Sequence, residues 1–181
     1  ADTTGSSRVS GVNLGNTNGV LDPAGPYVDK TAMFDISTNA LDGAMVVMKG
    51  DTLKTGAFSI NAIGDTALSS ALGTEQFGMC LYETSGSGLD FSFGTVGTNA
   101  YNSASCNSTT QTAGTGSTGG VGTAQFGFNT ADTTSAAGDT ITKKPAGSTS
   151  TATMAFIGNI ANTTEAGIYT TTLTFIATGT Y

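Results

Sequence analysis

Histidine and tryptophan are absent from the 181-residue sequence, and the lack of histidine removes several kinds of chemistry. Neither a Ser-His-Asp nor a Cys-His catalytic arrangement can form, and metal sites ligated by histidine are excluded. The 13 acidic residues leave carboxylate-pair hydrolysis formally open, but they are spread singly along the chain. The glycine-rich stretch 114–122 lacks the lysine that follows in a phosphate-binding loop. An irregular calcium site at Asp22 or Asp51 stays an alternative. We therefore expect that the protein is not an enzyme and that it binds no cofactor.

Positive charge is scarce, because only six residues are basic and the net charge is −7 at pH 7. Nucleic-acid binding needs clustered Lys and Arg, and an acidic surface does not favour docking on anionic lipid. The sequence also has no run of about twenty apolar residues, the length that a membrane-spanning helix requires. We therefore expect neither a nucleic-acid partner nor a membrane span.

Charged residues of both signs make up only 10% of the chain, and threonine and glycine are abundant. This composition favours sheets over helices and suits a secreted surface. The chain opens Ala1-Asp2-Thr3-Thr4 without methionine, as a mature end left by signal-peptide cleavage would. We therefore expect a secreted protein at an extracellular surface, after removal of a signal peptide.

Two cysteines, Cys80 and Cys106, allow a single disulfide. They can also be two unlinked thiols, but an extracellular setting favours the disulfide. Closing a loop of this length would stabilise the fold by about 3 kcal/mol on the chain-entropy estimate. Asn107 and Asn162 each begin an Asn-x-Thr pattern, so both are possible glycosylation sites.

Short segments with alternating apolar and polar side chains recur along the chain, separated by turn residues about every ten positions. No convincing helix appears, and 65–72 can be a loop or a short helical turn. The stretch 94–121 is rich in Gly, Ser, Thr and Asn and is expected to be a long exposed loop. The expected strands are 28–38, 44–48, 57–63, 76–82, 89–93, 124–128, 152–157 and 167–181.

Eight or nine short strands without helices predict an all-β fold, an antiparallel β-sandwich of Ig-like or jelly-roll type. Residues 28–181 form this domain. Residues 1–27 are polar and glycine-rich, so they are expected to be an extended N-terminal arm. In the last segment, Thr residues dominate one face, and the other face carries the side chains that we expect in the core, namely Tyr169, Leu173, Phe175 and Tyr181.

The segment 166–181, A-G-I-Y-T-T-T-L-T-F-I-A-T-G-T-Y, resembles the final strand of secreted pilin-like and spore-coat-like β-sandwich subunits. Residues 34–40, followed by a turn and 45–47, are similar to surface β-domains. The resemblance implies donor-strand complementation, in which an extended arm of one subunit fills a groove of the next and a homopolymer results. The apolar candidates for the donor strand are Val9, Val12 and Leu14, and Tyr169, Leu173, Phe175 and Tyr181 would line the groove.

The function that these observations favour is a structural subunit of an extracellular filament, such as a pilus-like fibre, or of a surface layer. The alternative is a non-polymeric secreted adhesion or binding domain that uses the loop 94–121.

Overall fold

The computed structural model describes residues 11–15, 19–25, 27–91 and 124–181, with the side chains of 27–31 and 148 left aside. This part of the chain forms ten strands and one four-residue helix, α1 (Thr130–Thr133). The strands are β1 (Tyr27–Thr38), β2 (Ala44–Lys49), β3 (Lys54–Thr55), β4 (Phe58–Ser59), β5 (Gly64–Ser69), β6 (Gln76–Ser85), β7 (Gln125–Phe128), β8 (Asp139–Lys144), β9 (Gly147–Asn159) and β10 (Thr174–Gly179).

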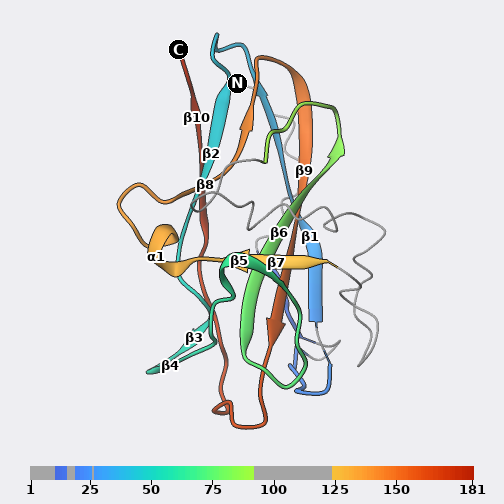
Figure 1. Ribbon diagram of the computed structural model, residues 1–181, viewed down its shortest axis with the longest axis vertical. Coiled ribbons are helices and arrows are strands. Elements are labelled where there is room, and N and C mark those ends of the chain that lie inside the picture. The colour runs from blue at the N-terminus through green and yellow to red at the C-terminus, as the bar shows by residue number, and fades with distance from the viewer. Residues whose placement is uncertain (1–10, 16–18, 26, 92–123) are drawn as a thin grey trace.

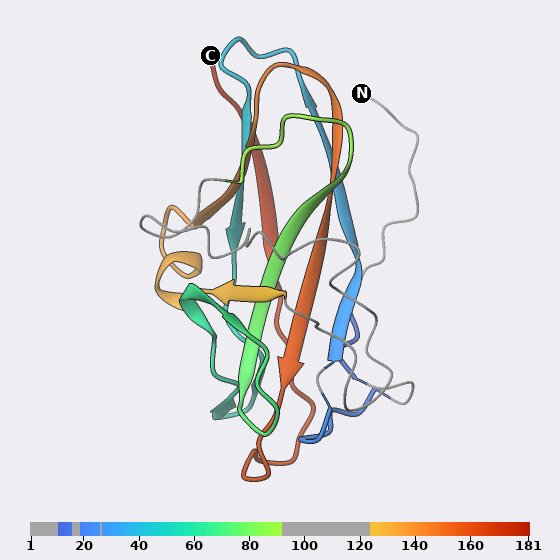
Figure 2. The same ribbon diagram turned by 45° about the vertical axis from the view of Figure 1, so that its right-hand side comes forward.

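Two sheets pack face to face in an antiparallel β-sandwich, which confirms the expected fold class (Figures 1 and 2). The larger sheet has five strands in the order β1-β9-β6-β7-β5, and the smaller has three in the order β10-β2-β8. A short β3-β4 hairpin forms a separate pair. The chain crosses between the sheets at both ends of the long axis, because β1 leads into β2 at one end and β9 leads into β10 at the other.

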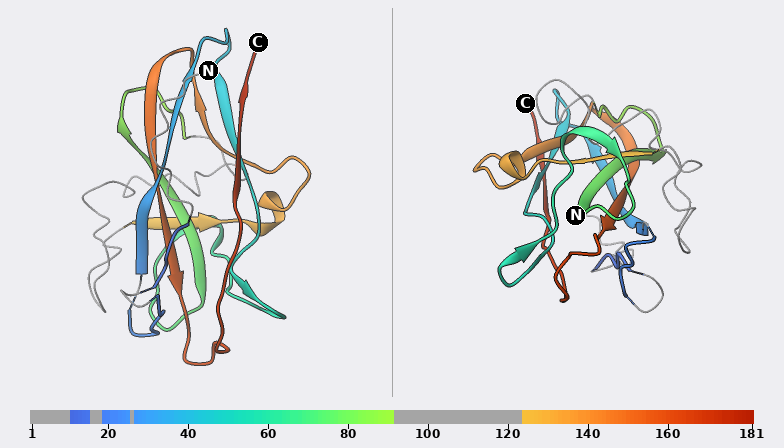
Figure 3. Two further views of the ribbon diagram at one scale, coloured as in Figure 1. Left: turned by 180° about the vertical axis from the view of Figure 1, so that it is seen from behind. Right: turned by 60° about the horizontal axis from the view of Figure 1, so that its bottom comes forward.

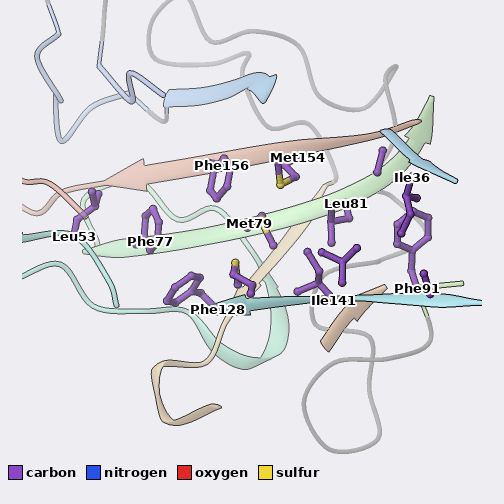
Figure 4. Close-up of a cluster of buried hydrophobic side chains, with 14 of the residues drawn as sticks. Ile36, Leu53, Phe77, Met79, Leu81, Phe91, Phe128, Ile141, Met154 and Phe156 are labelled. Carbon is purple, nitrogen blue, oxygen red and sulfur yellow. The ribbon is translucent and has the colours of Figure 1, made fainter. Parts of the chain in front are cut away.

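The core is centred on β6, a strand whose two faces are both buried. Phe77, Met79 and Leu81 point toward the three-stranded sheet (Figure 4). They share the main core cluster with side chains of β2 and β8 from that sheet and with side chains of β7 and β9 from their own sheet. The rings of Phe77 and Phe128 meet edge to face, with 4.9 Å between their centroids. On the opposite face of β6, Cys80 belongs to a second buried cluster.

Besides the two-residue β3, two strands form where the sequence did not predict them. β5 occupies residues that we expected to form a loop or a helical turn, and it pairs with β7 through contacts such as Leu68 opposite Phe126. β8 pairs with β2, although its residues include Asp139, Thr142 and Lys144, all of them buried. Conversely, the expected strand at 89–93 is reduced in the described residues to one bridge between Asp90 and Lys143. Strand pairing stabilises both new strands, and their composition alone does not show it.

The last strand is shorter than predicted, because β10 begins at Thr174 and not at Gly167. Thr170 is already paired, since its N–H donates to the Lys54 carbonyl at 2.9 Å and its carbonyl accepts from the Lys54 N–H at 3.0 Å. The last segment therefore pairs first with β3, at Thr170, and then with β2, from Thr174 onward. The change of partner interrupts the strand.

Candidate functional site

The candidate site is the side of the sandwich bounded by β1 and β10. Each is the last strand of its sheet in the described part of the chain, with β9 as the neighbour of β1 and β2 as the neighbour of β10. Both strands lie toward the viewer when the molecule is seen from behind, and β7 crosses at the far side (Figure 3, left). We call this surface the open side. A terminal strand presents N–H and C=O groups that a further strand can pair with.

The two outer strands of the smaller sheet differ in how well they are covered. In β8, Ile141 and Thr142 are fully buried, and Lys143 exchanges backbone hydrogen bonds of 2.7 and 2.8 Å with Asp90. In β10, only Phe175 is half-buried, and every other residue is exposed. The smaller sheet is therefore closed along β8 and open along β10.

The apolar side chains along the open side contact the core without being fully covered. Tyr169, Leu173 and Phe175 are half-buried and pack against the main core cluster, as do Ala32 and Phe34 of β1. The large apolar side chains of the central strands, such as Phe77, Met79 and Phe156, are buried almost completely. The core of the sandwich therefore reaches the surface between β1 and β10.

Two close contacts hold the chain that leads into β10. The Thr171 hydroxyl donates to the Asp51 carbonyl at 2.6 Å. Leu173 lies directly over Gly50, where an added Cβ would be 2.6 Å from Leu173 Cδ2 and from the Thr172 carbonyl oxygen. Gly50 has φ +148°, a backbone conformation that other residues rarely adopt. Gly50 thus permits the position of Leu173 against the core.

Tyr181 is not a core residue, and its placement with Tyr169, Leu173 and Phe175 was wrong. Its side chain is 92% exposed. β10 ends at Gly179, and the Thr180 N–H donates to the Gly43 carbonyl at 2.8 Å. Tyr181 lies beyond the last pairing with the smaller sheet, so the alternation that begins at Tyr169 no longer places it over the core.

The three candidate donor residues differ in how far the structure describes them and in how deeply they are buried. Val9 lies outside the described residues. Val12 is 36% exposed, whereas Leu14 is half-buried and packs against the main core cluster beside Gly158 of β9. Neither Val12 nor Leu14 belongs to a strand. Leu14 therefore contacts the core of its own chain, and the role of Val9, Val12 and Leu14 in a donor strand stays a prediction.

A cavity of about 670 Å³ lies where these residues meet the connection between β9 and β10. Its wall includes Val12, Leu14, Ile160 and Tyr169, and Glu165 contributes a carboxylate. The Tyr169 hydroxyl donates to the backbone carbonyl of Glu165 at 2.9 Å. Burial, together with the negative charges of Glu75 and Glu165, raises the pKa of Tyr169. The cavity is thus mainly apolar inside and acidic nearby.

The other predicted positions are spread over the molecule. Cys80 is fully buried in β6 and is not a free thiol, whereas Cys106 lies outside the described residues, so their pairing stays a prediction. Asn107 also lies outside them. Asn162 is exposed in the connection after β9, where a glycan could be attached.

The aspartates considered for calcium have local partners. The Asp22 carboxylate accepts a hydrogen bond from the Ala24 N–H at 2.8 Å. The Asp51 carboxylate forms an ion pair with Lys54, and this hydrogen bond lowers the pKa of Asp51. Across the described ranges, no group of three or more His, Cys, Asp or Glu side chains is placed to hold a metal ion. Both carboxylates therefore bind groups within their own turns.

Comparison of the chain with models of protein families, with curated proteins and with solved structures finds no match. Among the residues that the structure places, no helix is long and apolar enough to cross a membrane.

Proposed function

We propose that this chain is a structural subunit of an extracellular filament or surface layer, and that its copies join by addition of a β-strand to the open side. The observation that carries the proposal is the exposure of the core between two terminal strands, β1 and β10. An added strand would pair with free backbone groups and cover half-buried apolar side chains at the same time.

The asymmetry between β10 and β8 supports this assignment. A secreted domain that acts alone needs both margins of its sheets protected from pairing with other chains. Here β8 is covered by the chain around Asp90, but β10 carries neither a charged residue nor a proline that would hinder pairing. The exposed strand is therefore suited to receive another strand.

A single backbone group can test the proposal. The Thr180 N–H points toward β2, because it donates to Gly43, and N–H directions alternate along a strand. Ala177 is three residues earlier, so its N–H points away from β2 and into the open side. The pairing of β2 with β8 gives the same direction. Lys143 of β8 bonds Asp90 and so points away from β2, which means that its neighbour Thr142 points toward Val46 of β2. Val46 therefore bonds toward β8 and not toward Ala177, the residue opposite it on β10.

Ala177→Pro removes this outward N–H and leaves the pairing of β10 with β2 in place. The matched control is Ala177→Thr, which keeps the N–H and favours a strand. We expect Ala177→Thr to assemble as the parent does, and Ala177→Pro to remain a folded monomer by circular dichroism, light scattering and electron microscopy. Normal assembly of a folded Ala177→Pro variant would contradict strand addition at β10. A parent chain that stays monomeric at all concentrations would favour the non-polymeric binding domain.

A further inference from the structure

The strand β10 lies within a segment that carries no charge. Residues 166–181 contain no Asp, Glu, Lys or Arg, in a chain whose net charge is −7. Copies of an acidic chain repel each other, and like charges directly opposite each other destabilise a pair of strands. The margin of the smaller sheet along β10 is therefore a place where two copies of this chain can approach without opposing like charges across the strands.

The two faces of β10 differ in character. Phe175 is half-buried and packs on the main core cluster, so it faces the core, and Ala177 and Gly179 lie on the same face by alternation. A Cβ placed on Gly179 would be 3.5 Å from Cβ of Ala40, a residue that is only 1% exposed, which gives the same direction. Ile176 lies on the outer face and is 44% exposed.

A second copy of β10 can pair with the first in antiparallel direction about a two-fold axis at Ala177. The Ala177 N–H points away from β2, and the N–H groups of Phe175 and Gly179 do the same, because the bonding direction repeats at every second residue. In this register Ala177 lies opposite Ala177 of the second copy, Phe175 opposite Gly179, and Ile176 opposite Thr178. About six backbone hydrogen bonds then join the two strands.

Other two-fold registers use less of the strand. An axis at Phe175 would pair 176–179 with 171–174, although β10 begins only at Thr174. An axis at Gly179 would pair Ala177 with Tyr181, which lies beyond the last hydrogen bond to the smaller sheet. The axis at Ala177 pairs residues 174–180 throughout, and all of these belong to β10 or bond Gly43.

The side chains that are exposed in one copy fit the other copy in this register. A Cβ placed on Gly179 would be 3.6 Å from Cε2 of Tyr181, so the Tyr181 ring, which is 92% exposed, borders the space that Gly179 leaves open. Phe175 of the second copy lies opposite Gly179 and would enter this space against the Tyr181 ring, an aromatic contact of a favourable kind. On the outer face, Ile176 opposite Thr178 forms a pair of β-branched side chains.

The charged residues beside β10 are compatible with this pairing. Lys49 of β2 lies opposite Thr174, and the Asp42 N–H donates to the Thr180 carbonyl at 3.2 Å. Because Thr174 of one copy lies opposite Thr180 of the other, Lys49 of one copy and Asp42 of the other come to the same end of the paired strands. Their charges are opposite in sign.

We propose that the strand added to β10 is β10 of a second copy, in an antiparallel pair centred on Ala177. The contact is two-fold, so the open side of each copy faces the open side of the other, and the half-buried side chains between β1 and β10 are covered (Figure 3, left). A two-fold contact closes a pair, and a filament or layer grows from such pairs through other surfaces. This inference rests on the proposed function, because it names the partner of the same strand.

The test is disulfide mapping with full-length variants. Ile176→Cys and Thr178→Cys each place one thiol on the outer face of β10, and both positions are exposed. In the proposed register these two positions of different copies are opposite each other with about 4.5 Å between Cα atoms, a separation that a disulfide bridges. Two copies of the same variant hold their thiols on residues about 7–8 Å apart, at or beyond that reach.

Under mild oxidation, an equimolar mixture of Ile176→Cys and Thr178→Cys should give about tenfold more cross-linked dimer than either variant alone. Non-reducing electrophoresis and peptide mass analysis measure the yield and the linked positions. The matched control is Leu68→Cys mixed with Ile176→Cys, because Leu68 is 46% exposed in β5, at the opposite margin of the larger sheet from β1. This mixture should not cross-link, and the parent chain controls for its own two cysteines.

Equal yields from the mixture and from the separate variants would overturn the self-pairing of β10. So would a mixture that does not cross-link although the parent assembles and Ala177→Pro does not, and strand addition at β10 would then stand with another strand as the partner. A parent chain that stays monomeric, or a folded Ala177→Pro variant that assembles normally, would overturn the proposed function and this inference with it.

Discussion

Truncation of two phenylalanines on opposite sides of the sandwich should have very different consequences. Phe128 of β7 is fully buried and meets Phe77 edge to face, whereas Phe175 of β10 is half-buried on the open side. Phe128→Ala removes a fully enclosed ring, which costs about 3–5 kcal/mol of unfolding free energy. Phe175→Ala removes a ring that water already reaches, so we expect about 1–2 kcal/mol in the isolated subunit.

The assay is thermal and urea unfolding at concentrations where the subunit is monomeric. For a chain of this size, 1 kcal/mol corresponds to roughly 2–4 °C in Tm. Phe128→Ala should therefore lower Tm by about 6 °C or more, and Phe175→Ala by about 2–8 °C. Tyr181→Ala is the control, because the side chain is 92% exposed and its removal should change stability by less than about 0.5 kcal/mol.

Assembly should reverse the order of importance. If an added strand covers Phe175, its truncation should weaken association about tenfold or more, which is about 1.4 kcal/mol. Phe128→Ala should leave association unchanged once the variant is folded, because the ring is enclosed within its own subunit. Equal losses of stability for Phe128→Ala and Phe175→Ala in the monomer would refute the reasoning, since the core would then be closed on both sides.

Three further outcomes follow from single positions. Gly50→Ala should lower the unfolding free energy by more than about 2 kcal/mol in urea, because its Cβ would lie 2.6 Å from a backbone carbonyl oxygen; Gly73→Ala, also at positive φ but with open space, should cost only about 1 kcal/mol. Burial raises the pKa of Tyr82, so the stability that its neutral form contributes is complete below pH 10 and is lost as the pH rises through the higher folded value. Tyr82→Phe should flatten the alkaline branch of a plot of stability against pH. Non-reducing peptide mapping should recover Cys80 linked to Cys106, and two separate carbamidomethylated peptides would contradict the pairing.

Much of the fold follows from side-chain alternation. Phe77, Met79 and Leu81 alternate along β6 as the sequence predicts, and the strand at 28–38 agrees with β1 to within one residue. These segments bury one row of large apolar side chains, so the period of two is visible without knowledge of the partner strand. The sandwich could therefore be predicted.

The strands that were missed lack such a row. β8 reads D-T-I-T-K-K, and its single large apolar residue is Ile141. Asp139 and Lys144 are buried there because neighbouring chain covers them, which no local pattern records. β5 has Leu68 half-exposed and depends on its pairing with β7. In both segments the local preference for a strand is weak, and tertiary contacts stabilise the strand.

The candidate site was predicted in part. The row Tyr169, Leu173 and Phe175 could be assigned to the core side, because the alternation persists through the interruption before β10. The cavity could not be predicted, because it forms between residues 12–15 and 19–23 on one side and 160–169 on the other, which are far apart in sequence and carry no shared motif. Tyr181 was misplaced because a periodic pattern does not show where the pairing stops.

Leu14 shows how an extended segment can cover the exposed core. It packs on the main cluster beside Gly158, close to the start of β1, and its chain is neither helix nor strand there. Phe34 and Phe175 belong to the same cluster but remain half-buried. The segment around Leu14 therefore covers only the cavity end of this core. Completing the cover needs more chain of the same extended kind, and the free backbone groups of β10 would hold that chain in register. An added strand, as we propose, would cover the core and pair with β10 at the same time.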